Sequence, residues 1–374
     1  MRILFLVRSL GLGGAETQLA YLARGLHDKG HSVQVTTLYD GGRIWDSLVS
    51  AGVVCTHLHK RSRWDLLSPL RMLIDTASSF RPDVIYSFMP AANVFSALAR
   101  SRLLPAAVVW GVRSARVDWD FYGVAPVLLA RLEGWLSSRA NLIICNSEAG
   151  KQYHAGAGWN EARMIVVENG FDLDEFFPDA AAGAQVRAEL RVSPQTRVVG
   201  IVGRIDPIKD HPSFLRMAAA VLSKHRTCEF WCVGAGTGDG YLERMQDYAR
   251  SLGISDSVRW LGPRRDMRAV YSAMDVTCLT SLAEGFPNVV GESMACGTPC
   301  VAFDVGDAAR IVQDRDLVIP ERSHEQLAAA VLRVLGEDGS LRGRVRDRIA
   351  SNYSLSRCVE RTEECLSQVA LGSV

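Results

Sequence analysis

The stretch that decides the fold is Ala283-Glu284-Gly285-Phe286-Pro287-Asn288-Val289-Val290-Gly291-Glu292-Ser293-Met294-Ala295-Cys296-Gly297. An apolar run just before it, Val276–Leu279, predicts a buried strand, and a polar turn follows that run. Pro287 suits the first turn of a helix, and Gly297 suits its end. The stretch therefore completes a succession of strand, loop and amphipathic helix, which is the repeating unit of a parallel α/β sheet.

Two carboxylates, Glu284 and Glu292, lie on either side of the predicted helix start with seven residues between them. Glu284 lies in the loop at the positive end of the helix dipole, and Glu292 lies roughly 6–8 Å further along at 1.5 Å per residue. Backbone N–H groups around Asn288, Val289 and Val290 would face an anion. This arrangement suits an elongated ligand with an anionic middle and hydroxyls at both ends, such as a nucleotide-sugar.

Two other interpretations of this carboxylate pair remain open. Glycoside hydrolases also use two carboxylates, roughly 5–9.5 Å apart. A helix cap with one solvated glutamate would need no ligand at all. A loop acid beside a helix end that attracts phosphate favours the nucleotide-sugar.

The composition is that of a soluble protein with two domains. A chain of 374 residues is too long for one ordinary core, and its 48% hydrophobic and 22% charged residues are typical of globular proteins. No apolar run approaches the ~20 residues of a membrane span, and we expect no signal peptide before the first strand. The nine cysteines lie in apolar segments, which predicts reduced core residues in a cytoplasmic protein.

The net charge of +1 argues against a nucleic-acid partner. The charge is unevenly distributed, because residues 1–172 hold 18 Lys and Arg against 14 Asp and Glu, whereas the remainder holds 24 against 27. A modest basic excess in the first part favours contact with an anionic surface.

Strand and helix patterns alternate along the whole chain. The clearest predicted strands are Ile3–Val7, Ala107–Val112, Leu142–Cys145 and Val198–Val202, and the clearest predicted helices are Gln18–Lys29, Asn93–Ser101, Glu325–Leu335 and Leu355–Ala370. The alternation pauses between Asn169 and Thr196, which predicts a connection between domains. The sequence thus predicts an α/β protein with two doubly wound parallel sheets.

Glycines follow the first strand of each predicted domain. The first set, Gly11-Leu12-Gly13-Gly14, precedes a helix, and this placement lets backbone N–H groups approach a phosphate. It is not a dinucleotide-binding G-x-G-x-x-G motif, because the third glycine would fall on Glu16. A tight turn that packs helix on sheet explains this set equally well.

The second set is Gly203-Arg204, with Lys209 shortly after it. These residues follow the carboxyl end of a predicted strand, where open α/β sheets bind ligands. Two cations there would neutralise a diphosphate and stabilise it as a leaving group. The alternative is that both are ordinary surface cations.

The sequence resembles the retaining glycosyltransferases of family 4 (glycosyl transferases group 1), over essentially all 374 residues. Their GT-B fold has two Rossmann-like domains that face a central cleft. The residues that carry the resemblance are Gly13-Gly14-Ala15-Glu16, Asn146-Ser147, Asn169-Gly170-Phe171-Asp172, Gly203-Arg204, Lys209, Glu284 with Glu292, and Gly297-Thr298-Pro299.

The resemblance implies a role for each part of the chain. Residues 1–172 would bind the acceptor, residues 173–196 would form a linker, and residues 197–354 would bind the nucleotide-sugar. A helix within residues 355–374 would cross back to the first domain. The reaction would transfer a sugar, with retention of configuration, from a UDP- or GDP-sugar to a hydroxyl of a lipid-linked or glycan acceptor in polysaccharide or glycoconjugate biosynthesis.

The resemblance also implies roles for single residues. Arg204 and Lys209 would contact the donor diphosphate, Glu284 the transferred sugar, and Glu292 the ribose. The other donor-binding candidates are Gly13, Gly14, Gly203, Asn288, Val289 and Val290.

One position departs from the family pattern. Many members have a histidine after the strand equivalent to Ala107–Val112, where it contacts the donor sugar, and this sequence has Arg113. A guanidinium cannot act as a general base at neutral pH, so we expect Arg113 to bind a phosphate or the acceptor. The reaction class is unaffected, because the departing diphosphate is commonly thought to take the acceptor proton in retaining transferases.

We expect no required cofactor and no metal. The D-x-D pattern of metal-dependent transferases occurs at Asp118-Trp119-Asp120, Asp172-Leu173-Asp174 and Asp314-Arg315-Asp316. Three scattered copies indicate chance, and the Arg204 and Lys209 cations already supply the charge that a metal would.

Residues 57–73 combine cations, Trp64 and several leucines. A helix of this kind can lie on an anionic membrane, although a helix packed on the sheet with a basic edge would show the same pattern. The resemblance favours the membrane, because many relatives glycosylate lipid-linked acceptors. We therefore expect a cytoplasmic protein that contacts the inner face of a membrane peripherally.

Two alternative functions follow from the same fold. A non-catalytic scaffold subunit could bind a nucleotide-sugar, but it would not need all of Arg204, Lys209, Glu284 and Glu292. A sugar-nucleotide epimerase could share the GT-B fold, but such enzymes do not carry this pair of glutamates in the same form.

Overall fold

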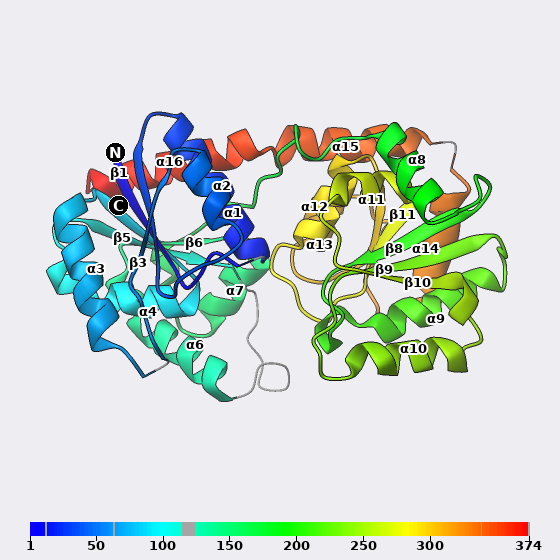
Figure 1. The fold of residues 1–374 in the computed structure, drawn as a ribbon, viewed down its shortest axis with the longest axis horizontal. Coiled ribbons are helices and arrows are strands. Elements are labelled where there is room, and N and C mark those ends of the chain that lie inside the picture. Colours follow the sequence, from blue (N-terminus) through cyan, green and yellow to red (C-terminus); the bar gives the residue numbers. More distant parts are fainter. Residues whose placement is uncertain (12, 63, 114–123, 338, 373–374) are drawn as a thin grey trace. The chain divides into compact units, whose positions relative to one another are not determined.

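The structure is a computed structural model that describes residues 1–11, 13–62, 64–113, 124–337 and 339–372. The chain divides into two compact units, one of Met1–Gly170 with Leu355–Val374 and one of Phe171–Ser354. Each unit holds one sheet of parallel strands with helices on both faces (Figure 1). The prediction of two Rossmann-like α/β domains is therefore confirmed.

The first sheet has the strand order β3-β2-β1-β4-β5-β6-β7. Its strands are β1 (Arg2–Val7), β2 (Ser32–Thr37), β3 (Val54–His57), β4 (Val84–Phe88), β5 (Ala107–Val112), β6 (Leu142–Cys145) and β7 (Met164–Val166). Because β1 pairs with β2 on one side and with β4 on the other, the strand order reverses at this point.

Side chains of β1 alternate between two apolar clusters. Ile3, Phe5 and Val7 pack on one face with α1, α2 and α16, and Leu4 and Leu6 pack on the other face with α3, α4 and α6. The helices of this unit are α1 (Gly14–Asp28), α2 (Trp45–Ser50), α3 (Leu67–Phe80), α4 (Met89–Ala99), α6 (Val124–Leu136), α7 (Glu148–Gly156) and α16 (Leu355–Ala370). A strand covered on both faces is apolar at nearly every position.

One acid lies inside the first unit. The Glu133 side chain, on α6, is 3% exposed, and its Oε1 accepts a hydrogen bond from Asn93 Nδ2 at 2.6 Å. Asn93 Oδ1 in turn accepts a hydrogen bond from Ser87 Oγ. Burial raises the pKa of Glu133 to about 8, so this carboxyl is mostly protonated at neutral pH.

The second sheet has the strand order β10-β9-β8-β11-β12-β13. Its strands are β8 (Arg197–Val202), β9 (Cys228–Val233), β10 (Val258–Gly262), β11 (Val276–Leu279), β12 (Cys300–Phe303) and β13 (Val318–Ile319). Its helices are α8 (Ala180–Glu189), α9 (His211–Leu222), α10 (Tyr241–Ser251), α11 (Met267–Ala273), α12 (Asn288–Ala295), α13 (Ala308–Val312), α14 (His324–Leu335) and α15 (Ser340–Asn352).

Residues 173–196, expected as a linker, instead belong to the second unit. They contain α8, whose N-terminus is capped by Asp179 Oδ1 accepting from the Ala182 N–H. Val186 of α8 packs in an apolar cluster with Val270 and Met274. A Cβ at Gly183 would lie 2.8 Å from the Ser272 backbone. Because glycine has no Cβ, α8 can pack directly against the backbone of α11.

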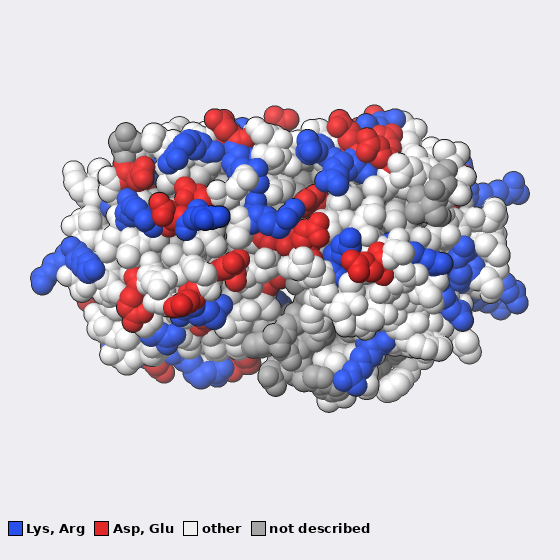
Figure 2. Space-filling view, turned by 180° about the vertical axis from the view of Figure 1, so that it is seen from behind, with Lys and Arg blue, Asp and Glu red and all other residues white. Residues whose placement is uncertain are grey.

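The surface carries both charges. On the face shown in Figure 2, acidic and basic side chains are interspersed. This distribution agrees with the net charge of +1.

Candidate functional site

The candidate site lies where the strand order of the second sheet reverses. β8 and β11 are neighbours there, although they are far apart in sequence. Gly203 and Arg204 follow β8, and the loop with Glu284 follows β11. Because ligands of open α/β sheets bind at such reversals, outside the carboxyl ends of the strands, the topology brings the two predicted motifs to a suitable place.

Lys209 and Glu284 form an ion pair, with Lys209 Nζ 2.5 Å from Glu284 Oε1. Both are largely shielded, since their side chains are 19% and 14% exposed. Gly203 has a φ of +148°, and a Cβ there would lie 3.1 Å from Lys209 Cε. The glycine therefore leaves room for the lysine side chain to pass, in a backbone conformation that other residues rarely adopt.

Backbone contacts tie the lysine turn to the glutamate loop. Thr280 Oγ1 donates to the Lys209 carbonyl at 2.8 Å, and the Leu282 N–H donates to the Ile208 carbonyl at 2.7 Å. The loop is also held from the other side, because the Asp307 N–H donates to the Gly285 carbonyl at 2.9 Å. Gly306 (φ +58°) permits this approach, since a Cβ there would lie only 2.6 Å from the Glu284 carbonyl oxygen. The ion pair thus rests on a fixed backbone.

Arg322, which sequence reasoning missed, joins the same two segments. Its Nη1 donates to the Ser281 carbonyl at 2.9 Å, and its Nη2 donates to the Thr280 carbonyl at 2.6 Å and to Asp210 Oδ2 at 2.7 Å. Its guanidinium lies over the Phe303 ring at 4.6 Å. Arg322 follows β13, so its position at a strand's carboxyl end is the signal that could have identified it.

Glu292 lies in the second turn of α12 and is partly buried. Its Oε2 accepts a hydrogen bond from the Tyr271 hydroxyl at 2.9 Å. Burial raises the pKa of Glu292 to about 7. A Cβ at Gly291 would lie 2.0 Å from Phe171 Cζ, so the helix packs on this ring through a glycine.

The first turn of α12 contains the candidates Asn288, Val289 and Val290. Pro287 precedes the helix and has no side-chain oxygen that could accept from their N–H groups. The Val290 N–H donates to the Pro287 carbonyl at 3.1 Å, so this amide is less available to a ligand than the sequence suggested.

Arg204 pairs with a different acid. Its side chain is 67% exposed, and its Nη2 lies 3.0 Å from Asp206 Oδ2. Among the described residues, Arg204 forms its ion pair with Asp206, whereas Glu284 pairs with Lys209.

Gly13, Gly14 and Arg113 belong to the first unit. Gly13 and Gly14 lie at the start of α1, after the carboxyl end of β1; Leu12 of the same turn lies outside the described residues. These glycines occupy the strand-order reversal of the first sheet, as Gly203 does in the second.

Arg113 is engaged by the protein. Its Nη1 donates to Asn169 Oδ1 at 3.1 Å, its Nη2 donates to the Tyr86 hydroxyl at 2.9 Å, and its guanidinium lies 4.4 Å from the Phe88 ring centroid. Its Nε is buried and has no recorded hydrogen-bond partner among the described residues. A catalytic or acceptor-binding role for this arginine stays a prediction.

The D-x-D segments in the described ranges form turns. The Asp174 N–H donates to Asp172 Oδ1, and the Asp316 N–H donates to Asp314 Oδ1, both at 3.0 Å. The third copy, Asp118-Trp119-Asp120, lies outside the described residues. Over those ranges, no three His, Cys, Asp or Glu side chains are grouped to hold a metal ion; metal independence stays a prediction.

Two family descriptions match this chain. Residues 12–175 match Glycosyltransferase Family 4, and residues 196–337 match Glycosyl transferases group 1. Together the two matches cover most of the sequence: the first lies almost entirely in the first unit, and the second lies in the second unit. The chain belongs to glycosyltransferase family 4.

The family 4 chain is similar to curated proteins named D-inositol 3-phosphate glycosyltransferase. One from Mycobacteroides abscessus is 37% identical over 201 residues, which cover 52% of this chain and 44% of the relative. One from Nocardia farcinica is 34% identical over 232 residues, which cover 59% of this chain and 51% of the relative. The matched part thus spans about half the length of these relatives.

Solved structures of the same fold cover nearly the whole family 4 chain. HepE of Anabaena in complex with UDP-glucose has a TM-score of 0.86 at 23% identity, covering 98% of this chain and all of that one. Sucrose-phosphate synthase of Thermosynechococcus elongatus has a TM-score of 0.79 at 18% identity and full coverage of both chains. These likenesses show the GT-B fold.

Proposed function

We propose that this family 4 protein is a retaining glycosyltransferase that moves a sugar from a UDP- or GDP-sugar to a hydroxyl acceptor. The observation that carries the proposal is the Lys209–Glu284 pair at the strand-order reversal of the second sheet. It places a cation for a diphosphate beside an acceptor for sugar hydroxyls. Glu292, on the helix that follows, adds an acceptor for a ribose diol.

The reaction would break the bond between the sugar's anomeric carbon and the diphosphate and form one to the acceptor oxygen. Lys209 and Arg204 would stabilise the charge that develops on the diphosphate. Glu284 would hold the sugar by its hydroxyls, and the acceptor proton would pass to the departing phosphate. Arg113 would not take this proton, because a guanidinium is a hydrogen-bond donor with no acceptor site.

Donor and acceptor are proposed from the relatives. A UDP-sugar is supported by the HepE structure, which contains UDP-glucose in a protein of the same fold. The names of these relatives, which are matched over about half of their length, support a phosphorylated inositol as an acceptor, beside the lipid-linked or glycan acceptor expected from the sequence. The first unit would bind the acceptor.

The test is to incubate the protein with UDP- and GDP-sugars, with and without inositol phosphate or a lipid-linked acceptor. Acceptor-dependent release of nucleotide, with a product of the donor's anomeric configuration, is the expected result. Donor binding without release would instead favour the non-catalytic scaffold, and a donor epimer as product would favour the epimerase.

Donor affinity should rise with pH through about 7. The Glu292 carboxyl, with a pKa raised to about 7 in the free protein, must be ionised to accept hydrogen bonds from both ribose hydroxyls. Below that pH, protons compete with the donor, so affinity should fall by up to tenfold per pH unit. Calorimetric titration with a UDP-sugar from pH 5.5 to 8.5 measures this, and Glu292→Gln should flatten the profile. A steep profile that survives the substitution would contradict the assignment.

Arg322→Ala should lower kcat/KM for the donor by about 10- to 100-fold. Without its guanidinium, the Thr280 and Ser281 carbonyls lose their link to the Asp210 carboxylate. The hydrogen bonds of Thr280 Oγ1 and the Leu282 N–H remain, so Lys209 and Glu284 are held less firmly rather than released. Arg226→Ala removes an exposed arginine of the same unit and is the matched control. If only the melting temperature falls and kcat/KM is unchanged, Arg322 does not position the site.

A peripheral contact with an anionic membrane is proposed for residues 57–73 together with α6. Trp64 and Leu67 are each 82% exposed, and α6 exposes Val124, Leu128, Leu132 and Trp135 at helical spacing. The row of apolar side chains along α6, beside the exposed Arg131, suits a bilayer surface. None of the described helices has the length and hydrophobicity that a bilayer crossing requires.

Leu128→Ser with Trp135→Ser should reduce co-sedimentation with phosphatidylglycerol vesicles by about tenfold, because two apolar contacts with the bilayer are removed. Tyr153→Ser, at an exposed aromatic residue of α7, is the control. Equal binding by all three proteins would refute the contact through α6.

A further inference from the structure

A hollow of about 240 Å³ lies at the opposite edge of the second sheet from the candidate site. It opens beside the amino ends of β8 and β11, where Arg197 begins one strand and Asp275 precedes the other. The candidate site lies at the carboxyl ends of the same two strands. The proposed transfer reaction therefore makes no use of this hollow.

Three arginines converge on Asp275 beside the hollow. Arg187 Nη2 lies 2.7 Å from Asp275 Oδ2, and Arg197 Nη1 and Arg342 Nη2 lie 3.1 Å and 3.8 Å from Asp275 Oδ1. The Val198 N–H also donates to Oδ2 at 2.8 Å. One carboxylate cannot neutralise three guanidinium groups, so the cluster carries an excess of positive charge.

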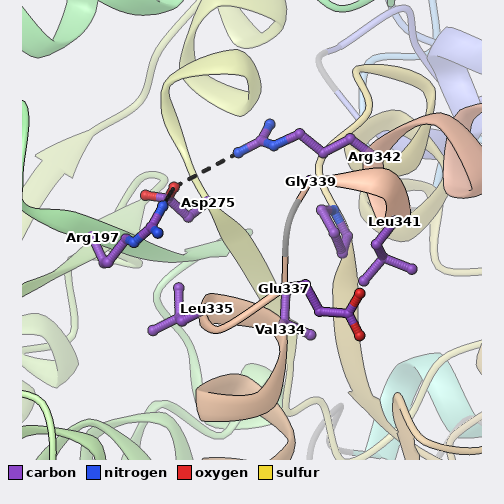
Figure 3. Close-up of a pocket in the computed structure, with 9 residues that line it drawn as sticks. Arg197, Asp275, Val334, Leu335, Glu337, Gly339, Leu341 and Arg342 are labelled. Carbon is purple, nitrogen blue, oxygen red and sulfur yellow. Dashed lines mark hydrogen bonds and ion pairs between the residues drawn. The ribbon is translucent and has the colours of Figure 1, made fainter.

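Arg187 is committed to the protein. Its Nε donates to the Ala273 carbonyl at 2.8 Å and its Nη1 to the Thr196 carbonyl at 2.9 Å. Arg197 and Arg342 line the hollow, and Figure 3 shows them on either side of Asp275. Arg342 Nη2 also donates to the Met274 carbonyl at 3.0 Å. Burial, and repulsion from the other two arginines, lower the pKa of Arg342. Asp275 opposes this effect only in part, so a second anion, bound from the side of the hollow, would further relieve the repulsion.

The rest of the wall is mainly apolar. Val334 and Leu335 end α14, Leu341 lies in the first turn of α15, and Pro299 precedes β12. Glu337 is exposed on the rim. A cationic side facing an apolar side suits a molecule with an anionic group and a less polar body.

We propose that this hollow binds a small phosphate ester, with its phosphate against Arg197 and Arg342 from the side of the hollow, opposite Asp275, and its body against Leu335 and Leu341. Arginine suits this task because its planar fork of donors matches two phosphate oxygens. The volume is slightly below the ~300–1,000 Å³ of sites for drug-sized ligands, so the ester has few carbons. The site is independent of the donor site and of the proposed transfer.

The test uses glycerol 3-phosphate as the probe, titrated into the full-length protein at constant ionic strength and followed by calorimetry. The proposed donor site also contains two cations that could bind the phosphate of the probe. The double variant Arg204→Gln with Lys209→Gln removes that cation pair and serves as the matched control. We expect binding to survive in that control and to weaken at least tenfold in Arg197→Gln with Arg342→Gln. Binding that is lost in the control and kept in the other double variant overturns the proposal. So does wild-type protein that binds no probe at about 10 mM.

Two single variants can replace the double variant Arg197→Gln with Arg342→Gln if that protein does not fold. Arg197 is 45% exposed in its side chain, so Arg197→Gln should fold and weaken binding severalfold. Glu337→Gln removes a repelling charge from the exposed rim and should strengthen binding about two- to threefold. Unchanged affinity in both variants would show that the probe binds elsewhere.

Discussion

Replacing Lys209 with alanine is expected to lower the rate of nucleotide release from a UDP- or GDP-sugar by about 10²- to 10³-fold. The ammonium group that would meet the departing diphosphate is lost. In addition, Glu284, whose side chain is only 14% exposed, loses the cation 2.5 Å away. A shielded carboxylate without its partner is itself unfavourable. Steady-state release measured at saturating acceptor gives the effect.

Lys224→Ala is the matched control, because Lys224 is an exposed lysine of the same unit at the end of α9. The double variant Lys209→Ala with Glu284→Gln separates the two causes. If the loss arises mainly from the unpaired carboxylate, the double variant should recover part of the rate. A Lys209→Ala protein as active as wild type would remove the central support for the proposed function.

The free energy of unfolding is expected to fall as pH rises from about 4.5 to about 8, and Glu133→Gln should abolish this part of the dependence. The unfolded carboxyl has a pKa near 4.5, and burial raises it to about 8 in the folded protein. The stabilisation from the protonated Glu133 carboxyl is therefore fully present below pH 4.5, and it is lost as the pH rises through 8. The full difference corresponds to about 5 kcal/mol as an upper bound.

Chemical denaturation at pH 5, 7 and 9 measures this effect. Glutamine keeps an oxygen for the Asn93 amide, so the variant should match wild type at pH 5 and exceed it by several kcal/mol at pH 9. Glu161→Gln, at an exposed glutamate of the same unit, should follow the wild-type curve. Parallel curves for wild type and Glu133→Gln would mean that Glu133 is ionised in the folded protein.

The sheets were predictable because their strands are buried on both faces. Runs such as Ala107–Val112 and Val276–Leu279 match β5 and β11 residue for residue. Helix starts were less predictable, and α4 begins at Met89 rather than Asn93 because Pro90 lies in its first turn. α15 was not predicted, although Leu341, Val345 and Ile349 recur every fourth residue between charged residues, which is the spacing of an amphipathic helix.

The site was predictable where residues lie close to a motif. Lys209 and Glu284 meet because the glycine turn after β8 and the loop after β11 are at adjacent strands. Arg322 was missed because β13 has only two residues, so its carboxyl end, the one signal for this arginine, is hard to recognise, and the pairing of β13 with β12 appears only in the fold. The engagement of Arg113 by Tyr86 and Asn169 likewise depends on contacts between segments far apart in sequence.

The ion pair between Lys209 and Glu284 has a consequence for selectivity. A diphosphate that takes Lys209 leaves Glu284 in need of another hydrogen-bond donor, which an intact donor supplies through its sugar and a free nucleotide does not. When the whole donor binds, the Glu284 carboxylate would exchange the Lys209 ammonium for the sugar hydroxyls. When the nucleotide product binds alone, Glu284 would lose Lys209 and gain no other hydrogen-bond donor. The Lys209–Glu284 ion pair would form again when the nucleotide leaves, which favours its release. We therefore expect the nucleotide product to bind more weakly than the intact donor, and product inhibition to be weak.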